Sequence, residues 1–168
     1  PLFQHSLYET ALASTIVNVV KNEGLDILHV HYAIPHASAG YMAKQILKSQ
    51  GINIPVVTTL HGTDITLVGR ESTYAPVVAF SINESDAITA VSDSLKAETL
   101  ESFDIEKEIH VIPNFVDVKR FHNTDKNHFK KMLAPEGERI LVHVSNFRSV
   151  KRVPDVIKIF AEVKKHVP

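Results

Sequence analysis

Polar side chains that could bind or deprotonate a ligand are concentrated at four points of the sequence, each directly after a short apolar run. These segments are 29–32 (HVHY), 58–64 (TTLHGTD), 113–117 (PNFVD) and 145–152 (SNFRSVKR). Open α/β sheets bind their ligands at the carboxyl ends of the strands. If the apolar runs are parallel strands, the four segments mark the places where a polar ligand binds.

The first segment offers an imidazole and a phenol to a ligand. Alternation along a strand places His29 and His31 on the same face, with Tyr32 at the strand end. His31 and Tyr32 are therefore candidate ligand contacts. His29 lies inside the strand, where a histidine is more often structural. The alternative is that one of the two histidines has its hydrogen bonds satisfied within the core and binds no ligand.

The second segment ends a strand with hydroxyl, imidazole and carboxylate groups around Gly62, which permits an unusual turn. His61 is the candidate ligand contact in this segment, and Asp64 is a further one. The alternative is that Thr63 or Asp64 caps a following helix through a side-chain oxygen.

The fourth segment places Arg148 and Lys151 in a loop that precedes a helix N-terminus, which adds partial positive charge. Arg presents a planar fork that matches phosphate oxygens, and Lys presents a point charge. The pair is a candidate clamp for a diphosphate whose negative charge grows as it leaves. A solvated basic loop is the alternative.

Other chemistries find less support in the residue pattern. A metal site would have to draw on His31, His36, His61 and Asp64, whose spacing matches no recognised ligand set, so we expect no metal. The GxSxG, Walker A and GxGxxG motifs do not occur, which disfavours serine hydrolases, P-loop NTPases and common dehydrogenases.

The composition is that of a folded globular protein. Of 168 residues, 44% are hydrophobic and 22% charged, which excludes a disordered chain, and a net charge of -1 provides no basic field for nucleic acid. The chain contains no Cys, which removes disulfides and thiol chemistry and suits a cytoplasmic protein. The start at Pro1 and the end in a helix lead us to expect a piece of a longer protein.

Hydrophobic periodicity predicts strands that alternate with helices. We expect strands at 25–31, 54–60, 87–91 and 109–112, with helices over 8–20, 39–47, 76–83 and from Ser92. Gly24 and Gly51 stand where the first two helices should end. This alternation predicts an α/β fold with a doubly wound parallel sheet.

The amino-acid composition changes at 114–138, where polar residues dominate, and we expect a linker with a short irregular helix. A new strand at 139–144 and an amphipathic helix with apolar positions from Val153 to Ala161 then begin a second α/β unit. We therefore predict three parts, namely the latter part of a first domain (1–113), a linker (114–138) and the start of a second domain (139–168).

Five segments taken in order resemble those of the retaining GT-B glycosyltransferases of the large family 4. They are HVHYAIPHA (29–37), TLHGTDIT (59–66), AVSDSL (90–95), VIPNFVD (111–117) and HVSNFRSVKR (143–152). The resemblance covers nearly the whole chain. It implies two Rossmann-like domains, an N-terminal one for the acceptor and a C-terminal one for the nucleotide sugar, both only partly represented here.

The resemblance also implies a reaction and roles for individual residues. The expected reaction transfers N-acetylglucosamine from UDP-GlcNAc to L-malate with retention, the first step of bacillithiol biosynthesis, without a protein nucleophile or a tightly bound cofactor. By motif position, Arg148 and Lys151 match the pair that neutralises the donor diphosphate, Asn146 is placed near the donor, and His61 near the donor sugar. The acceptor would meet Tyr32, Thr59 and His31. Asn114 would close the turn into the linker, and Ser92 would cap a helix.

Three alternatives remain open from the sequence. The acceptor could be another sugar or a lipid, the chain could be a non-catalytic nucleotide-sugar-binding module, or a His/Asp metal centre could catalyse hydrolysis. We expect the chain by itself to be inactive, and the sequence leaves the oligomeric state open, a homo-oligomer included.

Overall fold

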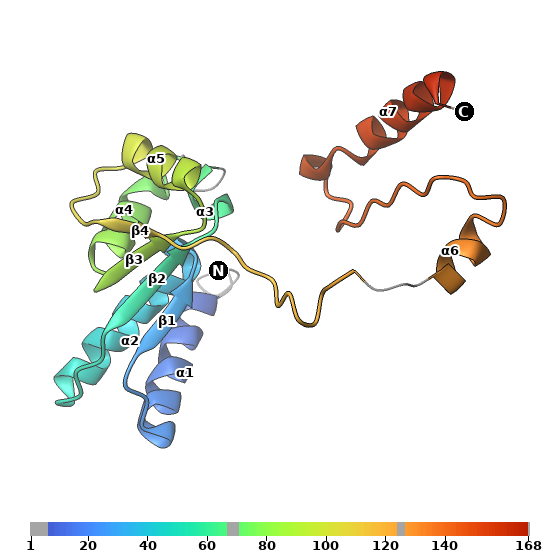
Figure 1. Cartoon of the computed structure of the whole chain (residues 1–168). Coiled ribbons are helices and arrows are strands. Elements are labelled where there is room, and N and C mark those ends of the chain that lie inside the picture. The colour runs from blue at the N-terminus through green and yellow to red at the C-terminus, as the bar shows by residue number, and fades with distance from the viewer. Residues whose placement is uncertain (1–6, 67–70, 124–126, 168) are drawn as a thin grey trace. The chain divides into compact units, whose positions relative to one another are not determined.

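The computed structural model describes residues 7–66, 71–123 and 127–167. The chain divides into two compact units, Pro1–Val116 and Asp117–Pro168 (Figure 1). No helix within the described ranges is both long and apolar enough to cross a lipid bilayer.

The first unit is built on a four-stranded parallel sheet. Its strands follow the chain in the order β1 (Leu28–His31), β2 (Val56–Leu60), β3 (Ala87–Ala90) and β4 (Ile109–Val111). All three neighbouring pairs are parallel. The predicted α/β fold class is confirmed, and each strand lies within the apolar run that predicted it.

Four longer helices accompany the strands, as the periodicity predicts. They are α1 (Tyr8–Glu23), α2 (Ser38–Ser49), α4 (Ala75–Asn83) and α5 (Asp93–Ser102). Gly24 ends α1 in the left-handed conformation, with φ of 64°, which is easy for glycine. The hydroxyl of Ser92 accepts a hydrogen bond from Leu95 N–H over 3.2 Å, so the predicted N-cap of α5 is confirmed. Two short helical segments, η1 (Ala33–Ala37) and α3 (Thr63–Thr66), were not predicted.

The helices bury one face of the sheet. Alternate strand residues point toward the helices, and Leu28, Val56, Ile88 and Ile109 among them are buried and belong to two apolar clusters shared with the helices. The intervening residues, among them His29, Thr59 and Thr89, lie on the opposite face because successive side chains alternate. The histidines of β1 therefore face away from the helix layer.

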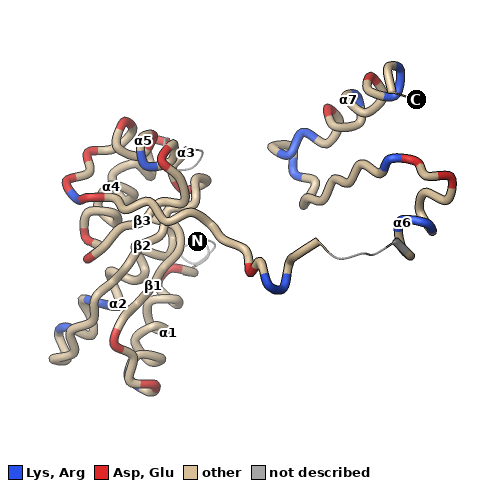
Figure 2. The backbone as a smooth tube through the Cα atoms, viewed as in Figure 1, with Lys and Arg blue, Asp and Glu red and all other residues tan. Residues whose placement is uncertain are grey.

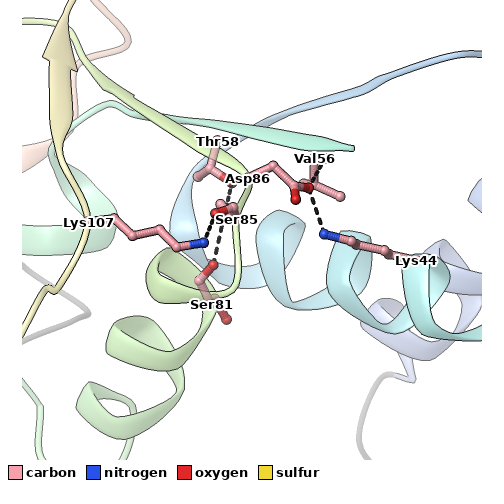
Figure 3. Close-up of polar contacts among 7 residues, drawn as sticks. All are labelled: Lys44, Val56, Thr58, Ser81, Ser85, Asp86 and Lys107. Carbon is pink, nitrogen blue, oxygen red and sulfur yellow. Dashed lines mark hydrogen bonds and ion pairs between the residues drawn. The ribbon is translucent and has the colours of Figure 1, made fainter. Parts of the chain in front are cut away.

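A polar cluster ties the amino ends of the inner strands together (Figure 3). Asp86 Oδ2 accepts hydrogen bonds from Val56 N–H and from Lys44 Nζ, each over 2.6 Å. Beside it, Ser85 shares a 2.7 Å hydroxyl hydrogen bond with Thr58, and the Ser85 carbonyl accepts from Lys107 Nζ. These contacts link α2, β2 and the start of β3 at the edge opposite the predicted ligand site.

The second unit contains α6 (Asn127–Leu133), the short η2 (Ser149–Lys151) and α7 (Val153–His166). The predicted helix after Val153 is confirmed, but the predicted strand at 139–144 is wrong, because this range forms neither a strand nor a helix. A strand needs a neighbouring backbone for its hydrogen bonds, and the described part of this unit provides none. Among its described residues, Ala134 is the one buried apolar side chain. The predicted three-part domain organisation stays a prediction.

The contacts of Asp86 lead to a testable prediction about stability. Burial raises the pKa of this carboxyl, but hydrogen bonds from Lys44 and Val56 N–H and the charges of Lys44 and Lys107 outweigh it, so the pKa lies below its ordinary value. A lowered pKa stabilises the fold above the unfolded-state pKa of about 4, and this contribution is lost as the pH falls. We expect Asp86→Asn to lower the free energy of unfolding by about 1 kcal/mol at pH 7.

Urea denaturation followed by circular dichroism at pH 7 and at pH 3 measures this effect. The difference between the wild type and Asp86→Asn should be smaller at pH 3, because the stabilisation that comes from the lowered pKa is lost progressively once the pH falls below the unfolded-state pKa. Asp26→Asn, at an exposed acidic residue, is the matched control and should leave stability unchanged at both values. A difference that is the same at both pH values would contradict the assignment.

Candidate active site

The carboxyl ends of β1 and β2 bring together the residues that the sequence singled out in the first unit. His31 is paired in register with Thr59, and Tyr32 N–H donates to the Thr59 carbonyl over 2.9 Å. His61 follows directly after β2. Side chains from segments about thirty residues apart therefore meet at the sheet edge where parallel α/β folds bind ligands.

A buried carboxylate joins the two loops that carry these side chains. Asp64 is 2% exposed. Its Oδ2 accepts from Ala33 N–H over 2.7 Å, and its Oδ1 accepts from Gly62 N–H over 3.1 Å. Both oxygens are engaged by backbone groups, one in the loop after β1 and one in the loop after β2. Asp64 thus joins the two loops, and its bond to Gly62 N–H lies at the start of α3. A direct contact between Asp64 and a ligand stays a prediction.

His31 and His61 form the central pair of the site. The His31 Nδ1 and His61 Nε2 atoms lie 2.8 Å apart, within hydrogen-bonding distance. The Tyr32 ring lies beside His61, with ring centroids separated by 5.0 Å. Tyr32 adopts φ of 77°, which is uncommon for a residue with a side chain. Such a backbone persists only where its surroundings hold it, and the hydrogen bonds of Tyr32 and Ala33 N–H provide this here.

The other two histidines support this pair. His36 Nδ1–H donates to the His31 carbonyl, and its Nε2 lies 3.4 Å from the Tyr8 hydroxyl. The His29 ring packs against His31 with centroids 4.6 Å apart. Within the described ranges, no group of three or more His, Cys, Asp or Glu side chains is arranged to hold a metal ion.

Thr59 lies on the sheet face opposite the helices and is nearly buried, in a row of hydrogen-bonded side chains. Its hydroxyl lies 2.8 Å from His29 Nε2 and 2.7 Å from the Thr89 hydroxyl. Thr89 was not among the residues predicted for the site, although alternation along β3 was a signal that could have found it. A direct contact between Thr59 and an acceptor remains a prediction.

The surroundings of His31 disfavour its protonated form. Burial lowers the pKa of His31, and the neighbouring imidazoles of His29, His61 and His36 lower it further. His31 is therefore neutral at pH 7 and carries one donor and one acceptor nitrogen. A groove of about 320 Å³ beside β1 is lined by three of these histidines and by apolar side chains, namely Leu12, Ile16, Leu28, His29, Val30, His31 and His36.

The second unit carries the basic residues predicted to bind a diphosphate. Arg148 directly precedes η2, and Lys151 ends it, with Lys151 N–H donating to the Arg148 carbonyl over 2.8 Å. Figure 2 shows Lys and Arg residues, in blue, in the segment that leads into α7. Arg148, Lys151 and Asn146 are all exposed, and α7 begins at Val153. Exposed cations just before a helix N-terminus suit a phosphate group.

The four-stranded parallel sheet with its accompanying helices defines the first unit as a Rossmann-like α/β domain. Residues 1–120 match the sequence profile of Glycosyltransferase Family 4. The chain belongs to this family.

Three similar proteins, all named as glycosyltransferases or as a sugar-transferring synthase, support the assignment to this family. The chain is 47% identical over 167 residues to the N-acetyl-alpha-D-glucosaminyl L-malate synthase of Bacillus anthracis, a match that covers 99% of the chain and 43% of that relative. A Bacillus subtilis protein named as a teichuronic acid biosynthesis glycosyltransferase is 30% identical over 79% of the chain and 34% of its own length. A glycosyltransferase of Methanocaldococcus jannaschii is 29% identical over 67% of the chain and 30% of its own length. The chain thus spans less than half the length of these relatives.

The role of Asp64 is open to a direct test. Asp64→Ala leaves the N–H groups of Ala33 and Gly62 without their partner, and hydrogen bonds to a buried charge are strong. We expect the free energy of unfolding to fall by about 2 to 4 kcal/mol, with a smaller loss for Asp64→Asn, which retains one acceptor oxygen. Chemical denaturation measures both. Asp93→Ala, at an exposed acidic residue of α5, is the control, and an equally small effect for Asp64→Ala would contradict the assignment.

Proposed function

We propose that this chain is part of a retaining glycosyltransferase that transfers N-acetylglucosamine from UDP-GlcNAc to L-malate, the first step of bacillithiol biosynthesis. The observation that carries the proposal is the 47% identity, over 99% of the chain, to a protein named N-acetyl-alpha-D-glucosaminyl L-malate synthase. Both substrates are small molecules, and the proposal includes no metal, no tightly bound cofactor and a cytoplasmic location.

The second unit contributes the donor-binding groups in this proposal. Arg148 and Lys151 neutralise the diphosphate, and Asn146 adds a polar contact to the donor. Negative charge grows on the diphosphate as the bond from the anomeric carbon to UDP breaks, so fixed cations stabilise the transition state more than the ground state. The malate hydroxyl attacks from the face that UDP leaves. Its proton passes to the departing phosphate, so no protein nucleophile takes part.

The first unit contributes the acceptor side and one contact to the sugar. Malate is a hydroxy dicarboxylate, and the Tyr32 hydroxyl and the His31 imidazole can both donate hydrogen bonds to carboxylates. The hydroxyl of Thr59 already contacts His29 and Thr89. A hydroxyl has one donor and two acceptor positions, so Thr59 can still donate to malate when His29 and Thr89 both donate to it. His61 is assigned to the donor sugar.

The family membership also fits a different acceptor, since a relative named for teichuronic acid biosynthesis is 30% identical to the chain. We favour malate because the identity to the malate synthase is higher and extends over more of the chain. The experiment is to mix the full-length protein with UDP-GlcNAc and a panel of L-malate, other hydroxy acids and sugars, and to measure UDP release and product mass. GlcNAc-malate supports the proposal, and turnover with another acceptor alone overturns the malate assignment.

Arg148 offers a sharper test of the mechanism. In the full-length protein, Arg148→Ala removes one fixed cation from the leaving diphosphate, and losing a contact of this kind costs about 2 to 4 kcal/mol in the transition state. We expect kcat to fall by roughly 30- to 1000-fold. Arg139→Ala, at another exposed arginine of the same unit, should retain full activity. Activity of Arg148→Ala within about twofold of the wild type would rule out the clamp.

A further inference from the structure

We propose that His31 is a positioning residue for His61. The hydrogen bond between His31 Nδ1 and His61 Nε2 orients the His61 ring, selects one tautomer and leaves His61 Nδ1 as the nitrogen that meets the ligand. The consequence for catalysis rests on the proposed function, in which His61 contacts the donor sugar. The effect on the ring itself does not depend on any reaction.

The backbone at His61 does not by itself hold the ring in place. His61 stands between the last residue of β2 and Gly62, whose φ of 117° lies in a region that glycine alone visits readily. The imidazole therefore needs a side-chain contact to keep one orientation. The partners found for it are His31, through the 2.8 Å contact, and the neighbouring Tyr32 ring.

His31, in contrast, is held from several directions. It is the last residue of β1, its carbonyl accepts a hydrogen bond from His36, and its ring packs against His29. His29 is in turn fixed by the Thr59 hydroxyl. His31 is therefore on a paired strand with two supporting neighbours, and it is a more rigid reference than a ring on a loop.

The number of protons on the His31 and His61 rings determines whether His61 Nδ1 donates or accepts a hydrogen bond. When both rings are neutral, the shared bond contains one proton, so either His61 Nε2 donates and its Nδ1 accepts, or the reverse. The groups around His31 are the imidazoles of His29 and His36, the Tyr32 ring and the hydroxyl of Thr59, while the Asp64 carboxylate is engaged by backbone N–H groups. The histidine neighbours resist a charge on His31, so His31 meets His61 as a neutral ring with one donor and one acceptor nitrogen.

Two variants of His31 separate a hydrogen-bonding role from a purely structural one. His31→Ala removes the partner of His61, whereas His31→Asn places a polar atom near the position of the lost Nδ1. His110→Ala is the matched control, because His110 lies on β4 with its side chain on the same face of the sheet and has no contact with His61 among those found.

Nitrogen NMR of the full-length protein labelled with ¹⁵N-histidine, recorded without substrates at pH 8, tests the proposal directly. We expect the wild type to show one protonated and one unprotonated ring nitrogen for His61. His31→Ala should bring the two resonances toward a common average as the tautomers interconvert, and His31→Asn should restore their separation. His110→Ala should leave them unchanged. Unaltered His61 resonances in His31→Ala would overturn the proposal.

Steady-state kinetics of the His31 variants then test whether the orientation of the His61 ring affects the reaction. With UDP-GlcNAc and L-malate, we expect His31→Ala to lower kcat roughly 10- to 100-fold, as small misplacements of a reacting group do, with a smaller change in the KM for UDP-GlcNAc. His31→Asn should recover most of the loss. If His31→Ala changes the tautomer of His61 but the wild type does not turn over UDP-GlcNAc and L-malate, the proposed function is refuted and the positioning role of His31 stands. Normal kcat in His31→Ala despite the tautomer change would refute the catalytic consequence.

Discussion

The candidate site depends on one buried carboxylate. Asp64 accepts hydrogen bonds from backbone groups of two loops that follow different strands, and it is almost completely removed from solvent. A buried charge is costly unless hydrogen bonds compensate it, so this arrangement tolerates little rearrangement. Because one loop carries Tyr32 and the other His61, the side chains of the site keep their relative positions only while Asp64 holds both loops.

The opposite edge of the sheet is organised by the same kind of interaction. Asp86 accepts from Val56 N–H and from Lys44, which joins the start of β3 to β2 and to α2. The two edges nevertheless differ in what surrounds the carboxylate. Asp86 is paired with lysines, whereas Asp64 is bound by backbone N–H groups beside a group of imidazoles. The edge with lysine partners is thereby neutralised, and the edge with histidines offers several donors and acceptors near neutral pH.

Much of the first unit could be predicted because its elements follow from local patterns. Apolar spacing located α1, α2 and the four strands, and Gly24 and Ser92 marked helix ends for the reasons expected of glycine and serine. The strand at 139–144 was wrong for a physical reason. Its apolar residues have the composition of a buried strand, but a strand exists only when a second backbone satisfies its hydrogen bonds, and sequence pattern does not report that partner.

The sequence by itself determined the α/β class, the order of the elements and the residue types that collect at the strand ends, because periodicity and turn chemistry act over a few residues. Only the tertiary structure decided which of those residues touch. In the folded chain, Asp64 accepts hydrogen bonds from backbone N–H groups and Thr59 bonds to His29 and Thr89. His31 Nδ1 lies 2.8 Å from His61 Nε2. These contacts join segments about thirty residues apart through parallel strand pairing, and the register of that pairing is a property of the whole sheet.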